Sequence, residues 1–266
     1  MSTDYSNILL VTDMDGTLIN RSGNVSEKNK EAIKKFKAGG GMFTFATGRS
    51  QTVMKHFADE LGANAPAILY NGGLLYNFTT GKILEQHPVD NSAEEIIRAV
   101  AGNMPDMAIE IHKGGEIYEY RTNKFTKFHI DVVHFTPIYI DDPSEISFPW
   151  MKIGFWFESD RYEALKEFVE PLCNENVHFL RTHMYSAELV NVNADKGMLI
   201  NRLKNRYPSK KIITCGDNEN DILMLKNSDD SYCPANSFDC AKKVAAHCLD
   251  SDCDHDFLSD VIERIK

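Results

Sequence analysis

The chain begins with a short apolar run that stops just before a pair of aspartates. Residues 8–11 (Ile-Leu-Leu-Val) are apolar without interruption, and Asp13 follows two positions later. Such a run is typical of a strand buried on both faces of a parallel sheet. Ser26 then precedes a segment with apolar residues at helical spacing, which ends at the glycines of 39–41. Because serine is a good N-cap and glycine a good helix stop, this segment is predicted to be a helix.

The same alternation of strand and helix patterns continues in two separate parts of the sequence. The first part adds strands at 42–46 and 67–70, with a helix between them that ends near residue 61. The second part begins after Asp195 and predicts helix 196–207, strand 212–215, helix 220–226, a short strand near residue 232, and helices 238–245 and 257–265. This alternation predicts an α/β fold with a Rossmann-like, doubly wound parallel sheet.

Between these two parts the pattern changes to that of an inserted α+β domain. Ser92 and Glu95 have the spacing of a capping box for a helix that extends to about residue 102. Two segments around a glycine turn then predict an antiparallel hairpin. Its strands, 107–112 and 116–121, precede predicted strands 152–157, 177–182 and 187–192 and a helix at 161–174.

These patterns set the expected domain boundaries. The α/β core would consist of residues 1–84 and 192–266, and the inserted domain of residues 85–191. Hinges would lie at 85–89 and 191–194, where the chain passes between the two domains.

Composition and charge narrow the class of protein. Of the 266 residues, 42% are apolar and 26% charged, as in an ordinary soluble globular protein. The apolar runs are far shorter than the roughly 18 residues that a membrane span needs, and the N-terminus lacks the pattern of a signal peptide. The net charge of -10 argues against a nucleic-acid partner. We therefore expect a cytoplasmic protein with no membrane or nucleic-acid partner.

Two residue types are predicted to fill the core. Six cysteines have no Cys-x-x-Cys pair, so the spacing indicates neither a zinc site nor a disulfide framework, and we expect reduced cysteines. The aromatic residues of the insert alternate along a predicted strand, which is more typical of a packed core than of a pocket. They are Trp150, Phe155, Trp156, Phe157 and Tyr162.

Two further groups of polar residues suggest metal ligands only weakly. The acidic stretch at 250–256 lacks the glycine and the spacing of an EF-hand, so we expect a solvated loop that caps the last helix. The histidines of the insert, His112, His129, His134 and His183, have no ligand-like spacing. We expect them at the surface or in hydrogen bonds.

Another set of polar residues gathers where predicted strands end or helices begin in the α/β part. They are Asp13 and Asp15, Thr47, Lys196, and Asp217, Asn220 and Asp221. Because the carboxyl ends of parallel strands meet at one edge of a sheet, we expect these side chains to converge. Carboxylates suit a hard cation such as Mg²⁺, and an amine with neutral donors suits an anion beside it. Phosphoryl transfer needs this combination.

Four short motifs carry a resemblance to a known family. They are Asp-Met-Asp-Gly-Thr at 13–17, Thr-Gly-Arg at 47–49, Lys-Gly at 196–197 and Gly-Asp-Asn-Glu-Asn-Asp at 216–221. In this order they resemble the motifs of the haloacid dehalogenase-like (HAD) superfamily, and together they are far more specific than any one motif. The large insert between the second and third motifs resembles that of the Cof-type, subclass IIB sugar phosphatases. The resemblance covers nearly the whole chain.

The resemblance implies a phosphatase mechanism with a covalent intermediate. Asp13 would attack phosphorus and become an aspartyl phosphate. Asp15 would protonate the leaving oxygen and then activate the hydrolytic water. The implied cofactor is Mg²⁺, held by Asp13, the backbone carbonyl of Asp15 and Asp217, with Asp221 nearby or bound through a water.

The resemblance also implies how the substrate is held. Thr47, Gly48 and Lys196 would bind the phosphoryl group, and Lys196 would reduce the repulsion of an anionic substrate. Asn220 would orient the nucleophile or the phosphate, and Arg49 would contact the substrate. That substrate would be a small phosphorylated metabolite, with sugar phosphates favoured, and the inserted domain would close over it as a cap.

Each motif alone has a simpler structural explanation. Asp13 and Asp15 could belong to a polar turn, Thr47 could cap a helix, and the acids of 216–221 could complement a helix dipole. Lys196 fits such an explanation poorly, because a lysine in the first turn of a helix is electrostatically unfavourable.

Two other functions could use the same motifs. A phosphomutase would form the same aspartyl phosphate but pass it to a second sugar hydroxyl. A non-catalytic regulator would only bind a phosphorylated metabolite, and is expected to lack Asp13 or Asp15, which are both present. No Gly-x-Gly-x-x-Gly follows the first strand, which argues against dinucleotide-dependent hydride transfer. The sequence leaves the physiological substrate and the oligomeric state open.

Overall fold

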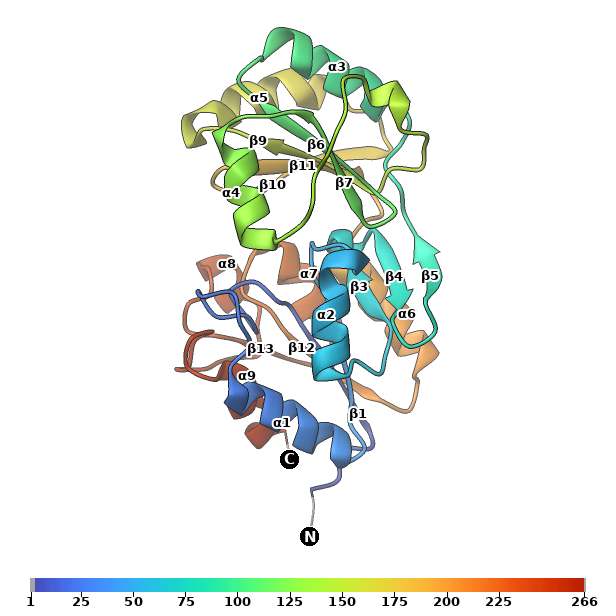
Figure 1. Cartoon of the computed structure of the whole chain (residues 1–266). Helices are drawn as coiled ribbons and strands as arrows, with labels where there is room; N and C mark the ends of the chain where they lie inside the picture. Colours follow the sequence, from blue (N-terminus) through green and yellow to red (C-terminus); the bar gives the residue numbers. More distant parts are fainter. Residues whose placement is uncertain (1–2, 266) are drawn as a thin grey trace. The chain divides into compact units, whose positions relative to one another are not determined.

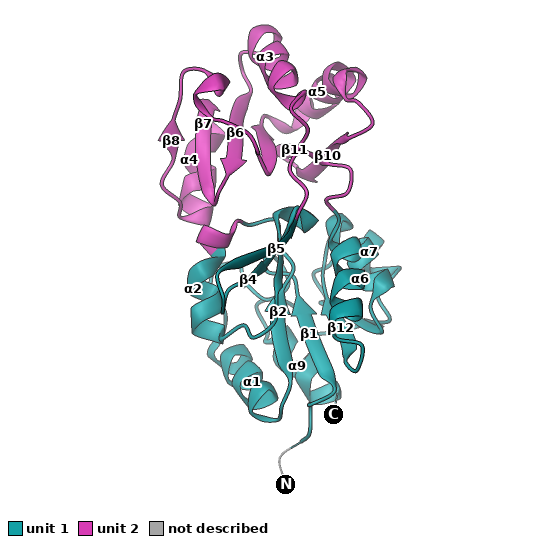
Figure 2. Ribbon diagram, turned by 90° about the vertical axis from the view of Figure 1, so that its right-hand side faces the viewer, with its two compact units in different colours: residues 1–49, 54–85, 195–266 teal, residues 50–53, 86–194 magenta. Residues whose placement is uncertain are grey.

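The chain folds into two compact units, each with a sheet of its own. The computed structural model describes residues 3–265. The first unit holds the described residues up to Arg49, Met54–Glu85 and those from Asp195 onward, and the second holds Ser50–Val53 and Gln86–Ala194 (Figure 2). Within residues 3–265, no helix has the length and apolar character needed to cross a membrane.

The central sheet of the first unit has the strand order β14-β13-β12-β1-β2, and all neighbouring strands are parallel. Its strands are β1 (Ile8–Thr12), β2 (Met42–Phe45), β12 (Lys211–Cys215), β13 (Asp230–Cys233) and β14 (His247–Cys248). Every residue of β1 is buried, as expected for a central parallel strand. Thr12 lies opposite Cys215, so the loops after β1 and β12 begin at the same sheet edge. The predicted α/β class with a parallel sheet is confirmed.

Helices lie on both sides of this sheet (Figures 1 and 2). They are α1 (Glu27–Ala38), most of α2 (Gln51–Leu61), α6 (Lys196–Arg206), α7 (Ile222–Asn227), α8 (Asp239–Lys242) and α9 (Phe257–Arg264). α6 and α7 pack on an apolar cluster that includes Leu9 and Ile212. α1 packs beside α9, where the buried side chain of Asn29 accepts a hydrogen bond from the backbone N–H of Ser259. Ser26 caps α1 as predicted, because its Oγ accepts from the backbone N–H of Asn29.

A three-stranded sheet in the first unit includes two strands that the sequence analysis missed. β3 (Ala67–Leu69) pairs with β4 (Leu74–Asn77), which is followed by β5 (Lys82–Gln86) in the sheet. In the hairpin of β4 and β5, only Leu74 and Leu75 are buried. Its sequence therefore shows little of the alternation of apolar and polar residues that predicts a strand. Strand β14 was missed because it has two residues, and α8 is shorter than the predicted helix 238–245.

The second unit is built on a six-stranded sheet with the order β10-β11-β9-β6-β7-β8. The strands are β6 (Ala108–Lys113), β7 (Glu116–Arg121), β8 (Ile138–Tyr139), β9 (Lys152–Trp156), β10 (Val177–His183) and β11 (Ser186–Asn191). Helices α3 (Ala93–Asn103) and α5 (Tyr162–Val169) share one apolar cluster with the sheet. Trp150, Phe155 and Phe157 are fully buried in this cluster and Tyr162 packs against it, as predicted. Trp156 is only half-buried and lies next to His129.

Three local predictions for the insert were wrong or incomplete. Ser92 does not form the predicted capping box: its side chain makes no capping hydrogen bond, and its backbone N–H donates to Asp90. The predicted helix 161–174 ends at Val169, and a 3-10 turn, Glu170–Leu172, follows at a proline. Helix α4 (Lys124–Val133) was missed, although Asn123 and Thr126 form a capping box there.

A buried charged cluster lies on the sheet face opposite the apolar cluster. Glu110 and Glu119 are directly opposite each other on β6 and β7, and each is 1% exposed. His129 Nδ1 lies 2.7 Å and His112 Nε2 3.3 Å from the Glu110 carboxylate. Burial alone would raise the pKa of Glu110, but these histidines hold it well below its ordinary value. Burial, with the charge of Glu110, raises the pKa of Glu119 to about 9, so Glu119 is neutral at pH 7.

We predict that Glu119→Gln makes the protein more stable at high pH. The pKa of Glu119 rises from 4.5 to about 9 on folding, so wild type loses stability progressively as the pH rises between these values. Glutamine carries no charge, so the variant should gain over wild type at pH 9 by up to roughly 6 kcal/mol, the equivalent of the whole pKa shift, and nothing below pH 4. Urea unfolding across this pH range measures the difference. The exposed Glu163→Gln should follow wild type, and an identical pH dependence in both variants would contradict the assignment.

Candidate active site

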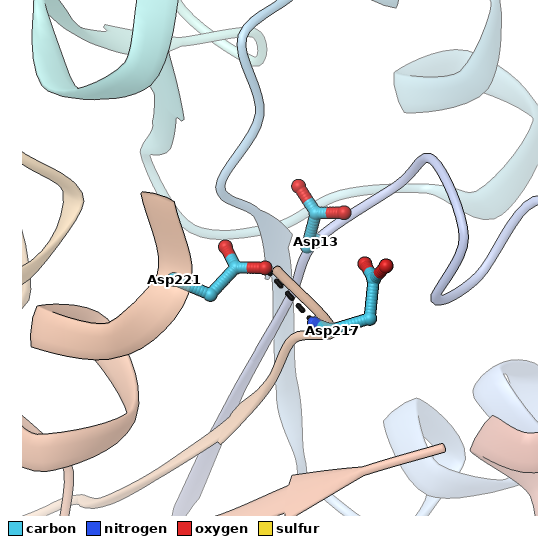
Figure 3. A group of neighbouring side chains, drawn as sticks. All are labelled: Asp13, Asp217 and Asp221. Atoms are coloured by element: carbon cyan, nitrogen blue, oxygen red, sulfur yellow. Dashed lines mark hydrogen bonds between the residues drawn. The ribbon is translucent and has the colours of Figure 1, made fainter. Parts of the chain in front are cut away.

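Three buried carboxylates meet at the edge of the central sheet where β1 and β12 end. Asp13 follows β1, and its backbone N–H donates to the Cys215 carbonyl at the end of β12. Asp217 and Asp221 follow β12. One carboxylate oxygen from each of the three aspartates lies within 4.8 Å of the others (Figure 3). None of the three residues is more than 6% exposed. These three side chains converge in the structure, as the sequence predicts.

Lys196 places one ammonium group among these carboxylates. It is the first residue of α6, after the N-cap Asp195. Its Nζ lies 2.7 Å from Asp13 Oδ1 and 2.7 Å from Asp221 Oδ1, and its side chain is completely buried. Burial acts to lower the pKa of Lys196, but the two carboxylates raise it above its ordinary value, so the ammonium stays charged.

One ammonium does not balance three carboxylates. Burial raises the pKa of Asp13 well above its ordinary value, and although Lys196 opposes this, Asp221 and Asp217 add to it. Burial and Asp221 raise the pKa of Asp217 to about 7, although a hydrogen bond from Thr17 opposes the shift. The cluster therefore favours an additional positive charge. Three oxygen ligands so close together fit a hard divalent cation, so this part of the site could hold a metal ion.

Asp221 and Thr17 hold the loop that carries Asp217. Asp221 Oδ2 accepts the backbone N–H of Asp217 at 2.9 Å (Figure 3) and that of Asn218 at 3.2 Å. Thr17 Oγ donates to Asp217 Oδ1 at 2.8 Å. Both oxygens of Asp221 are thus already engaged, which suits a positioning role better than direct metal ligation. The sequence analysis did not single out Thr17, although it is the last residue of the first motif.

Gly16 lies where the first motif approaches Asp217. Its φ of +80° is in the left-handed region, and a Cβ there would lie 2.7 Å from Asp217 Oδ2. A larger residue at this position would therefore displace either the turn or the carboxylate.

The side chain of Asp15 lies apart from the three-carboxylate cluster. It is 57% exposed and forms a bidentate ion pair with Arg49, with Nε 2.8 Å from Oδ2 and Nη2 2.5 Å from Oδ1. Arg49 also packs over the ring of Phe57. Although Asp15 is only two residues from Asp13, its carboxylate therefore lies outside the cluster.

The second motif is joined to Asn220 through Asn71. Thr47 is buried, its Oγ accepts the backbone N–H of Arg49, and its carbonyl accepts the backbone N–H of Asn71. Asn71 Oδ1 accepts Asn220 Nδ2 at 3.0 Å, and a Cβ on Gly48 would come within 3.0 Å of the Asn71 amide. The structure thus brings Thr47, Gly48 and Asn220 together around Asn71. Sequence reasoning missed Asn71, although an Asn-Gly-Gly turn was visible there.

The segment after β13 makes hydrogen bonds that hold the site in place. Asn236 Nδ2 donates to the Gly16 carbonyl at 2.7 Å, and the backbone N–H of Phe238 donates to the Asp217 carbonyl at 2.9 Å. The acidic stretch at 250–256 leads into α9 as predicted, with Asp256 as the N-cap residue, but the Asp256 carboxylate makes no capping hydrogen bond and accepts from Ser26 instead. Carboxylates of this stretch therefore bind residues near the N-terminus: Asp254 pairs with Arg21, and Asp256 accepts from Ser26.

Comparison with known proteins identifies the family. The model of the haloacid dehalogenase-like hydrolase family matches residues 10–262. The chain belongs to this family. A putative phosphatase of Mycoplasma pneumoniae is 23% identical to this HAD-like hydrolase over 262 residues, covering 93% of each chain. A 5-amino-6-(5-phospho-D-ribitylamino)uracil phosphatase of Bacillus subtilis is 22% identical, covering 91% of this chain and 90% of its own.

Solved structures show the same fold. A haloacid dehalogenase-like hydrolase from Bacteroides thetaiotaomicron superimposes with a TM-score of 0.88 at 22% identity, over 97% of this chain and 99% of its own. A protein from Thermotoga maritima gives 0.85 at 23% identity, over 97% of each chain. The predicted family, fold and enzyme class are confirmed: the protein is a HAD-like hydrolase of the phosphatase type.

We predict that Lys196→Met strongly destabilises the HAD-like hydrolase. Without the ammonium, Asp13 and Asp221 remain buried without their cation, which costs about 3–5 kcal/mol. Asp221→Asn in the same chain should recover part of this loss, because one unpaired charge is removed. Urea unfolding of the single and double variants measures both effects. Lys204→Met breaks a more exposed pair with Asp229 and should cost at most about 1 kcal/mol. Equal losses for the two lysines would refute the dependence on Lys196.

Proposed function

We propose that the protein is a Mg²⁺-dependent phosphatase that hydrolyses small phosphorylated metabolites through an aspartyl phosphate on Asp13. The observation that carries the proposal is the 2.7 Å contact of Lys196 Nζ with Asp13 Oδ1 inside a cluster of three buried carboxylates. A lone carboxylate would repel a phosphate ester. An ammonium and a cation beside it would allow the two anions to approach.

In the proposed first step, Asp13 is the nucleophile. Lys196 holds Oδ1, so Oδ2 is the oxygen that attacks phosphorus; the new O–P bond forms as the ester P–O bond breaks. Bound Mg²⁺, with Asp13, Asp217 and the Asp15 carbonyl as ligands and Asp221 nearby, would neutralise charge on the phosphoryl oxygens. Thr47, Gly48, Asn220 and Lys196 are proposed to hold the phosphoryl group.

Asp15 is the proposed acid and base. It would give a proton to the leaving oxygen in the first step and take one from water in the second, which regenerates Asp13 and releases phosphate. Its exposed position outside the carboxylate cluster supports this role, because a proton carrier must reach the ester oxygen. Arg49, which pairs with Asp15, is proposed to contact the substrate.

Sugar phosphates are the proposed substrate class, and water the proposed acceptor. The subclass IIB resemblance of the motifs and insert favours sugar phosphates, and the curated relatives named above carry phosphatase names, which favours hydrolysis over transfer to a second sugar. The second unit, Gln86–Ala194 with Ser50–Val53, is proposed to act as the cap that selects the substrate. A cytoplasmic location is part of the same proposal.

We predict that Asp13→Asn loses phosphatase activity while the protein still folds. Turnover of p-nitrophenyl phosphate and of a panel of sugar phosphates should fall by about 10³-fold or more, because an amide is a poor nucleophile. EDTA should abolish wild-type activity and Mg²⁺ restore it. Circular dichroism checks the fold, and the exposed Asp59→Asn serves as the control. Undiminished turnover by Asp13→Asn would overturn the proposed function.

We predict that Asp15→Asn slows turnover by about 10²–10⁴-fold and lengthens the life of the phosphoenzyme. The amide cannot activate the water that cleaves the aspartyl phosphate. Acid quench of the variant during turnover, followed by intact mass measurement, should show a species heavier by one phosphoryl group. Asp59→Asn should show none under the same conditions. A wild-type rate for Asp15→Asn would exclude the acid/base role.

A further inference from the structure

Two cysteines lie side by side at the edge of the central sheet. β13 and β14 are parallel neighbours, and Cys233 is directly opposite Cys248. Their sulfur atoms are 2.9 Å apart, with the Cys233 thiol donating to Cys248 Sγ. Cys233 is completely buried, whereas Cys248 is exposed. The pair therefore joins an exposed residue to a buried one.

The backbone at this pair is compatible with a covalent S–S bond. Neighbouring strands are about 4.8 Å apart, which lies within the Cα separations of about 4.4–6.8 Å found for disulfides. Closing the bond needs the two sulfur atoms to approach from 2.9 Å to about 2.05 Å. Small changes in side-chain torsion are sufficient for a movement of this size.

We propose that Cys233 and Cys248 form a reactive dithiol, a modification site at which hydroperoxides oxidise Cys248 and Cys233 then closes an intramolecular disulfide. The family assignment and the proposed phosphatase site do not involve either residue. The inference also goes beyond the expectation, based on sequence spacing, of six reduced cysteines without a disulfide framework.

The chemistry has two balanced steps. The Cys248 thiol loses its proton and the thiolate attacks one peroxide oxygen; an S–O bond forms, the O–O bond breaks, and the other oxygen takes up that proton and leaves as water or an alcohol. The Cys233 sulfur then attacks the Cys248 sulfur of the sulfenic acid; the S–S bond forms, the S–O bond breaks, and water leaves with the Cys233 thiol proton. The two sulfurs together lose two electrons, which the peroxide gains.

The different surroundings of the two sulfurs assign their order of reaction. Burial, followed by the contact with Cys248, raises the pKa of Cys233 to about 12, so this sulfur is a neutral thiol in a site that reagents do not enter. Cys248 is exposed and meets the oxidant first. Cys233 needs only to attack the sulfur already in contact with it.

The linked segment is the one that supports the carboxylate site. Residues 234–247 lie between the two cysteines and include Asn236 and Phe238, which bind the Gly16 and Asp217 carbonyls. The disulfide would close this segment into a loop. Its formation requires no phosphatase activity, so its test does not depend on the proposed function.

Peptide mapping after oxidation tests the proposal. The native protein is treated with hydrogen peroxide, remaining thiols are alkylated, and the denatured protein is digested with trypsin without reduction. Trypsin leaves Cys233 with Cys240 in peptide 227–242, and Cys248 with Cys253 in peptide 244–264. We expect a linked pair of these peptides whose mass is the sum of the two peptide masses less two hydrogens. Reduction with dithiothreitol should separate them. Fragmentation of the linked peptides identifies the joined residues in wild type, and Cys240→Ser with Cys253→Ser should retain the link.

Single variants distinguish the two roles. Cys248→Ser should form no link. Cys233→Ser should stop at a Cys248 sulfenic acid, which dimedone traps. The matched control Cys173→Ser, a partly buried thiol elsewhere in the chain, should link as wild type does. The proposal is overturned if wild-type Cys248 proceeds to sulfinic acid without a link to Cys233, or if the link joins other residues.

Discussion

The buried ammonium of Lys196 is the interaction on which the candidate site depends. Removing an ion from water costs several kcal/mol even after the protein relaxes, so buried charges persist only when they are paired. Lys196 contacts Asp13 and Asp221 at the same 2.7 Å distance and lets both carboxylates exist in the interior. Asp217, the third, makes no hydrogen bond to Lys196, and burial together with the charge of Asp221 raises its pKa to about 7. The site is therefore stable as a structure but still short of positive charge, which is the condition for binding a cation.

The close approach of the carboxylates determines the backbone around them. β1 and β12 are parallel neighbours, so Asp13 and Asp217 start from the same sheet edge. The turns after the strands must then bring acids together without side-chain collisions. Gly16 and Gly216 meet this need, because a Cβ on either would lie under 3 Å from Asp217 or Asp221. These two glycines are thus a consequence of the carboxylate cluster.

Sequence reasoning found the parts of the site that belong to regular elements. The apolar run of β1 and the motifs after it predicted where Asp13, Lys196 and Asp217 meet. It missed Thr17, Asn71 and Asn236, since the side chain of each reaches the site through a hydrogen bond with a residue at least 149 positions away. The periodic pattern of apolar residues along a helix or strand gives no sign of such contacts.

The fold was predicted in the same uneven way. The parallel sheet was predictable because its central strand, β1, begins with four consecutive apolar residues and is buried throughout, whereas the exposed hairpin after β3 and the short strand β14 have no such signal. Missing β14 also hid the pairing of Cys233 with Cys248. These residues are 15 positions apart and become neighbours only through strand register. Cysteine spacing along the chain carries no information about such a pair.

Asp15 and Arg49 show why the proposed acid/base role needs an exchangeable contact. Arg49 occupies both oxygens of Asp15, whose side chain is 57% exposed, whereas the side chain of Arg49 is only 11% exposed. An incoming phosphate would compete with Asp15 for the Arg49 guanidinium, which Phe57 continues to support. Once Arg49 turns to the anion, the Asp15 carboxyl is available to the ester oxygen. The two proposed roles then form one exchange, in which the anion that takes Arg49 is also the one that frees Asp15.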